Sequence, residues 1–233
     1  MEDNRMDKPA PMDPGTFISG GSAAVDFPDA DSLAQKNIAC RRPDEALLRM
    51  HRYLRTPARY AHPRWLTLLG FTSEATWYYG ANPPLDRCLN RALRARRGTP
   101  PLPVMLSPRQ QRMVQLAPRL QAFALAAGLL VLDCNDYFLL PDYRRKLLHL
   151  LDDGLIRQLF GLCRGSNRAL FSPAQLAEVA LQLGTAVLSR AGRGDPVLHA
   201  LLITLAPCER ALWVPVPVPA MNFLERTLCT GFR

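Results

Sequence analysis

Histidine and cysteine are the residue types in this sequence best suited to catalysis or metal binding, and both are widely scattered. The chain has four histidines and six cysteines, and none of them has Cys-x-x-Cys or Cys/His ligand spacing. His62 and His149 are the histidines that a hydrolase or transferase could use if its site were assembled from distant segments. His62 has no serine, cysteine or carboxylate at a useful offset, so we interpret it as a helix cap or a core anchor.

Recognisable catalytic motifs are also missing from the sequence. It has no His-Glu-x-x-His, no Gly-x-Ser-x-Gly, no P-loop and no Rossmann glycine pattern. The cysteines are interpreted as small buried hydrophobic residues in a reducing compartment, because no two of them are close in sequence. We therefore predict a protein that is not an enzyme and that needs neither a cofactor nor a metal.

Charge is distributed unevenly along the chain. The formal net charge is +9, but residues 1–40 carry seven acidic and three basic side chains, which leaves +13 for the rest. A basic body of this kind suits an acidic protein surface, a nucleic acid or an anionic membrane. Arginine-rich codon usage in a GC-rich genome is the alternative explanation for the excess.

Five arginines are the candidates for binding an acidic partner. They are Arg87, Arg91, Arg94, Arg144 and Arg145. The first three follow i, i+4, i+7 spacing in a helix expected over residues 85–97, whose opposite side carries leucines and Cys88. The last two come early in a helical segment, where positive charge suits the helix dipole poorly, so we expect them to point outward and to be available.

The elements that must position these residues are helices, and the segment 106–171 is the clearest case. Ser107-Pro108-Arg109-Gln110 has the pattern of a capping box with proline at the first helical position. The most apolar run follows, from Leu120 to Leu132, and it is shorter than the ~20 residues of a membrane-spanning helix. Gly128 and several alanines in this run indicate close helix contact. A leucine stripe with a 3.6-residue period continues through residues 139–160.

This pattern predicts an all-α fold with a single compact multi-helix domain. We expect a disordered acidic tail at residues 1–40, the helical domain at 41–206, and an extended Val-Pro segment at 207–233. The end of that last segment, from Met221, is expected either to form a short helix or to fray. The acidic, polar start of the chain is no secretory signal, so we expect a soluble, cytoplasmic protein.

Two stretches of the sequence resemble a known family. The first is a Tyr-x-His-Pro-x-Trp-Leu segment, formed by Tyr60, His62, Pro63, Trp65 and Leu66. The second is the region 116–162, in which an apolar Leu/Ala/Gly-rich helix precedes a Leu-Leu-x-x-x-Arg-Arg segment and a leucine-rich pair of helices. Together they resemble the SctK family (the YscK/HrpD/OrgA group), accessory sorting-platform proteins of bacterial type III secretion systems. Pro141 departs from the continuous polar turn usual in that family.

The resemblance implies a cytoplasmic adaptor without enzymatic activity. Members of the family link the cytoplasmic domain of the inner-membrane ring protein (SctD) to the pod protein (SctQ), at the cytoplasmic face of the inner membrane. On this interpretation the Tyr60–Leu66 motif is structural, with Trp65 buried and His62 fixed by a hydrogen bond. The alternative is a basic helical nucleic-acid-binding protein, although the sequence has no helix-turn-helix pattern and no aromatic platform.

Overall fold

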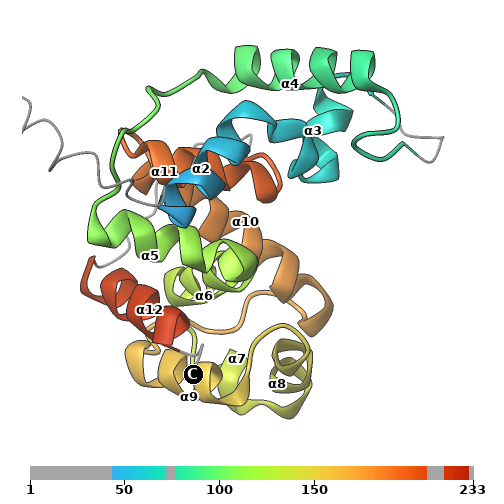
Figure 1. Cartoon of the computed structure of the whole chain (residues 1–233). Coiled ribbons are helices and arrows are strands. Elements are labelled where there is room, and N and C mark those ends of the chain that lie inside the picture. Colours follow the sequence, from blue (N-terminus) through green and yellow to red (C-terminus); the bar gives the residue numbers. More distant parts are fainter. Residues whose placement is uncertain (1–43, 72–76, 209–217, 231–233) are drawn as a thin grey trace, which may run out of the picture. The chain divides into compact units, whose positions relative to one another are not determined.

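The computed structural model describes residues 44–71, 77–208 and 218–230, and every regular element in these ranges is a helix (Figure 1). The expected all-α fold is therefore confirmed. The acidic segment 1–40 and most of the Val-Pro run lie outside the described residues. Pro43–Arg233 forms one unit by its internal contacts, so the helical domain continues beyond the expected boundary at residue 206.

The first helices of this unit begin at local caps. Asp44 caps α2 (Glu45–Arg55) by accepting a hydrogen bond from the backbone N–H of Ala46. A 3₁₀ turn, η1 (Pro57–Arg59), leads to α3 (Pro63–Leu68), and Asn82 caps α4 (Pro83–Arg97). A small apolar cluster joins η1, α3, α4 and the later turn η3; its buried members are Ala58, Leu66, Leu89, Leu93 and Ile203.

The expected capping box at Ser107 begins α5 (Pro108–Leu116). The Gln110 backbone N–H donates to Ser107 Oγ, and the Gln110 side chain accepts from the Ser107 N–H at 3.0 Å. The 3₁₀ turn η2 (Ala117–Arg119) then continues into α6 (Leu120–Leu132). The helical run Pro108–Leu132 is long and apolar enough to cross a membrane by length and composition, but 67% of its apolar window is buried inside the fold.

The leucine-rich region 139–160 is divided among three helices, α7 (Asp136–Leu139), α8 (Pro141–Leu148) and α9 (Asp153–Leu162). Pro141 occupies the first position of α8, where its missing N–H costs no helical hydrogen bond. Asp152 begins α9 by accepting from the Leu155 N–H at 2.7 Å. The leucine stripe nevertheless faces one core, because Leu147, Leu151, Leu155 and Leu159 are all buried.

Helix α10 (Pro173–Ala191) lies directly against α6, and their backbones touch. Two glycines, Gly128 of α6 and Gly184 of α10, make this approach possible. A Cβ added at Gly128 would lie 1.7 Å from the Ala180 carbonyl oxygen, and one at Gly184 would lie 1.7 Å from the Ala124 carbonyl oxygen. The close helix contact expected from Gly128 is confirmed.

The chain then forms α11 (Pro196–Leu201), η3 (Leu202–Thr204) and α12 (Val218–Thr230). Leu224 and Leu228 of α12 are buried in the main core, where α12 contacts α5 and α6. Two guanidinium nitrogens of Arg109 in α5 donate hydrogen bonds to the Glu225 carboxylate in α12: Nη2 at 2.6 Å and Nε at 3.2 Å. An extended segment through residue 233 is therefore wrong for residues 218–230, where the alternative of a terminal helix is confirmed. Residues 209–217 lie outside the described residues.

Candidate partner-binding surfaces

The Tyr60–Leu66 motif holds α3 against the end of η3. His62 caps α3: its Nδ1 accepts from the Arg64 N–H at 3.2 Å, and its own backbone N–H donates to the Ile203 carbonyl at 2.9 Å. The expected hydrogen bond at His62 is thus confirmed, and Pro63 takes the first helical position as expected. Burial, together with the nearby positive charge of Arg64, lowers the pKa of His62 below its ordinary value.

Trp65 differs from expectation because it is half-buried, although Leu66 beside it is fully buried. The indole Nε1–H of Trp65 donates to the Leu205 carbonyl oxygen at 2.9 Å, so the ring lies at the edge of the smaller cluster and not inside it. Arg97, at the end of α4, places its guanidinium carbon 5.4 Å from the centre of the Trp65 ring. Through these contacts the motif connects α3 with α4 and with the residue that follows η3.

Arg97 takes part in these contacts and is not part of the exposed basic surface of α4. Its guanidinium donates a hydrogen bond to the carbonyl oxygen of His199, and burial lowers the pKa of Arg97 to about 10. Burial of His199 lowers the pKa of its imidazole, and the positive charge of Arg97 lowers it further. Arg97 therefore stabilises the junction between α4 and α11.

Three exposed arginines of α4 form a row at i, i+4 and i+7, which we call the α4 stripe: Arg87, Arg91 and Arg94. The opposite face of α4 is fixed by buried groups. Asn90 accepts a hydrogen bond from the Ala58 N–H at 2.9 Å, and Leu93 is fully buried. Within the described part of the chain, no carboxylate lies in ion-pair distance of the α4 stripe; Arg94 donates only to the Asn90 carbonyl. These three arginines point outward, as expected. Cys88 was expected on the apolar side of the helix, but it is exposed.

Arg144 and Arg145 do not share one environment. Arg145 is exposed, but Arg144 forms an ion pair with Asp153 across the turn between α8 and α9, at 2.5 Å. Asp153 also pairs with Arg157 one helical turn later. Hydrogen bonds from these two guanidinium groups hold the pKa of Asp153 below its ordinary value. Arg144 was expected to point outward without such a neighbour, and the structure places Asp153 beside it.

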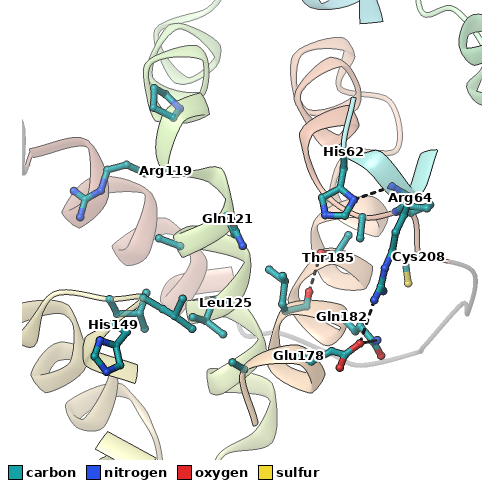
Figure 2. A pocket seen from close by; sticks show the side chains of 18 of the residues that line it. His62, Arg64, Arg119, Gln121, Leu125, His149, Glu178, Gln182, Thr185 and Cys208 are labelled. Carbon is teal, nitrogen blue, oxygen red and sulfur yellow. Dashed lines mark hydrogen bonds and ion pairs between the residues drawn. The ribbon is translucent and has the colours of Figure 1, made fainter. Parts of the chain in front are cut away.

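A cleft of about 1280 Å³ opens between α3, α6, α10 and the turn from α8 to α9, and we call it the α6–α10 cleft (Figure 2). Leu125 and Leu155 lie on its floor with Ala122, Ala177 and Leu181. Glu178, Gln182 and Thr185 reach it from α10, and His62 and Arg64 from α3 (Figure 2). His149 lines the cleft opposite His62, so the two histidines face an open space without forming a catalytic pair with each other.

Sequence reasoning missed this cleft, although two signals for it exist. Gln121 is the one polar residue in the apolar run of α6, and it marks the position where that helix reaches solvent. On α10, Ala177, Leu181 and Thr185 form a second stripe beside the stripe that is buried against α6. A helix with two apolar stripes needs two neighbours, and the second neighbour is not found among the described residues.

The described residues contain no group of three or more His, Cys, Asp or Glu side chains that could hold a metal ion. Residues 48–207 match a protein family described as a type III secretion system subunit. The chain belongs to this family. Comparison with curated proteins and with solved structures found no match.

Membership of the family connects the chain with the bacterial type III secretion apparatus, and it suggests a structural or accessory role in place of catalysis. The matched range contains the Tyr60–Leu66 motif, the α4 stripe and most of the cleft-lining residues. The surfaces described above therefore belong to the part of the chain that the family shares.

Proposed function

We propose that the chain is an SctK-like adaptor of the sorting platform, without enzymatic activity, which links an SctD-like ring protein to an SctQ-like pod protein. Family membership supports the secretion system, and the resemblance of the Tyr60–Leu66 and 116–162 segments supports the SctK group within it. In this role the protein lies at the cytoplasmic face of the bacterial inner membrane and reaches the membrane through its protein partners.

The observation that carries the adaptor role is the α4 stripe. Three arginines lie in a row on one helix, exposed and without an acidic neighbour among the described residues, while the opposite face of that helix is anchored by Asn90 and Leu93. Elsewhere in the domain, arginines such as Arg109, Arg119 and Arg144 are paired with carboxylates. An unpaired row on a fixed helix is suited to an acidic strip on another protein, and Arg145 is a further candidate contact.

A charge-reversal experiment tests this proposal. The double variant Arg91→Glu/Arg94→Glu should bind the purified ring or pod protein at least about tenfold more weakly than the native chain, mainly through slower association. Native binding should also weaken as salt rises, because exposed charges are screened beyond about 8 Å at physiological ionic strength. Arg168→Glu/Arg193→Glu is the matched control, since it changes the net charge equally at exposed positions outside α4.

The alternative function has a clear signature in the same experiment. Measurable binding of DNA or RNA by the native chain at about 0.15 M salt, lost in the α4 variant, would support a nucleic-acid-binding protein. Tight nucleic-acid binding without affinity for either secretion protein would overturn the adaptor proposal. Equal losses in the α4 variant and its control would show that net charge, and not the α4 stripe, is responsible.

A further inference from the structure

The α6–α10 cleft lies where none of the described residues covers the central helix pair of the domain. Helices α6 and α10 contact each other through Gly128 and Gly184, and the groove beside that contact has a floor of Ala122, Leu125 and Leu181. Other faces of α6 are covered, since α6 also contacts α9 and α12. In Figure 2 the walls are α3 on one side and the turn between α8 and α9 on the other.

The walls of the cleft carry charges that are already paired. Arg64 of α3 forms an ion pair with Glu178 of α10 at 3.3 Å, and Arg119 pairs with Asp152 at 2.9 Å. Two arginines and two carboxylates give this region no net formal charge, in a chain whose net charge is +9. The cleft therefore differs from the positive α4 stripe in carrying no net charge, and it favours a partner surface that is apolar and also carries no net charge.

The size of the cleft points to a segment of protein and not to a metabolite. Its volume of about 1280 Å³ exceeds the 300–1,000 Å³ typical of small-molecule pockets. Two adjacent antiparallel helices, α6 and α10, give the groove an apolar floor between polar walls. Such a groove can receive an amphipathic helix, whose apolar residues repeat at i, i+3, i+4 and i+7. The small side chains Ala122 and Ala177 leave room for larger apolar residues on such a helix.

We propose that the α6–α10 cleft binds an amphipathic helix of a secretion-system partner, with an apolar docking face of zero net charge. The proposal rests on the adaptor function. It gives the adaptor a second binding surface that differs from the α4 stripe in its response to salt. Affinity at the cleft should stay within about twofold between low and high salt, because the contact depends on buried apolar surface and not on screened charge.

The test uses the full chain and fluorescent peptides of about 20 residues that tile the ring and pod proteins of the same secretion system. At least one peptide with a predicted amphipathic helix should bind the native chain and give a salt-independent Kd. Ala177→Trp fills the cleft without removing a contact, and it should weaken that peptide at least about tenfold. Ala174→Trp adds the same ring to an exposed position of α10 outside the cleft, and it should bind as the native chain does. Both variants should keep the native circular dichroism spectrum and melting temperature.

Each contrary result has a distinct meaning. If full-length ring or pod protein binds but no peptide does, or if Ala177→Trp binds its peptide normally, the cleft proposal is wrong and the adaptor function stands. Binding that falls steeply with salt would place the contact on charged surface and overturn the proposal. If the native chain dimerises in sedimentation and Ala177→Trp is monomeric, the occupant is a second copy. If neither full-length protein binds, both proposals fail together.

Discussion

Gly128 and Gly184 face each other across the contact between α6 and α10. Any side chain at either position would collide with the backbone of the other helix. The Cβ of any residue at 184 would lie 1.7 Å from the Ala124 carbonyl oxygen and 2.9 Å from the backbone nitrogen of Gly128. Each glycine comes four residues after a small residue, Ala124 or Ala180, that the opposite glycine approaches. The domain core is therefore built on backbone-to-backbone contact at its centre.

Gly184→Ala should destabilise the domain by about 1–3 kcal/mol or more, because the added methyl group can only be placed by separating the two helices. Urea denaturation followed by circular dichroism would measure the loss. Gly161→Ala is the matched control in α9, where nothing lies within 4 Å of the added Cβ. There the better helix propensity of alanine should raise the free energy of unfolding by about 0.5–1 kcal/mol. Equal effects of the two substitutions would contradict the close contact.

Ser107 begins α5 and Ser172 begins α10, and the two helices should respond differently to loss of the serine hydroxyl. Ser107 Oγ accepts from the Gln110 N–H, so Ser107→Ala should cost about 1 kcal/mol of unfolding free energy. At Ser172 the hydroxyl instead donates to Gln175 Oε1 at 3.0 Å, which also accepts from the Ser172 N–H at 3.3 Å. Ser172→Ala leaves that second bond in place and should cost less. Thermal melts of the two variants would compare them, and a larger loss at Ser172 would refute this assignment.

Trp65→Phe should separate the two contributions of this side chain. Phenylalanine keeps much of the apolar surface but leaves the Leu205 carbonyl without its indole donor, which should cost about 1–2 kcal/mol. Trp65→Ala removes both contributions and should cost more, about 2–4 kcal/mol, below the upper values for a fully buried aromatic residue. Chemical denaturation would measure the free energy of unfolding of the whole domain for both variants. A loss under 0.5 kcal/mol, within the usual range of surface substitutions, would mean that Trp65 serves only as a contact surface.

His62 should make the stability of the domain depend on pH. Its pKa in the folded chain lies below the ordinary value of 6.5, so the unfolded chain takes up a proton first as the pH falls. The stabilising contribution of neutral His62 is complete above pH 6.5 and is lost as the pH falls from there towards the lowered pKa. His62→Asn keeps an effective helix cap without a titrating ring. The variant should therefore lose less stability between about pH 7.5 and pH 5.5 than the native chain does. Identical pH profiles would rule out a contribution from His62.

The helical fold could be predicted from the sequence because its signals are local. Ser107, Pro108 and Gln110 specify a helix start within four residues, and the leucines from 147 to 159 define a buried face by their spacing alone. The outward direction of Arg87, Arg91 and Arg94 follows in the same way, because the leucines of α4 occupy its other side. These features depend on neighbours in sequence, and the structure has all of them.

The errors concern partners that are distant in sequence or on a separate helix. Arg144 was expected to be free, but the turn between α8 and α9 brings Asp153 beside it. The half-buried position of Trp65 is set by the Leu205 carbonyl, 140 residues away. Buried Leu224 and Leu228 and the Arg109–Glu225 ion pair attach the helix α12 to segments that are distant in sequence. No local pattern records such contacts, and the cleft, which is enclosed by segments far apart in sequence, is missed for the same reason.

The enclosure of α6 has a consequence for how this domain opens. Every residue from Phe123 to Leu130 is buried, and α9, α10 and α12 contact this helix. Amide protons in such a position exchange with solvent only when the whole domain unfolds, whereas those of short peripheral elements exchange through local opening. Deuterium uptake in the 123–130 stretch should therefore be the slowest in the described chain, and its rate would report the global free energy of unfolding without denaturant.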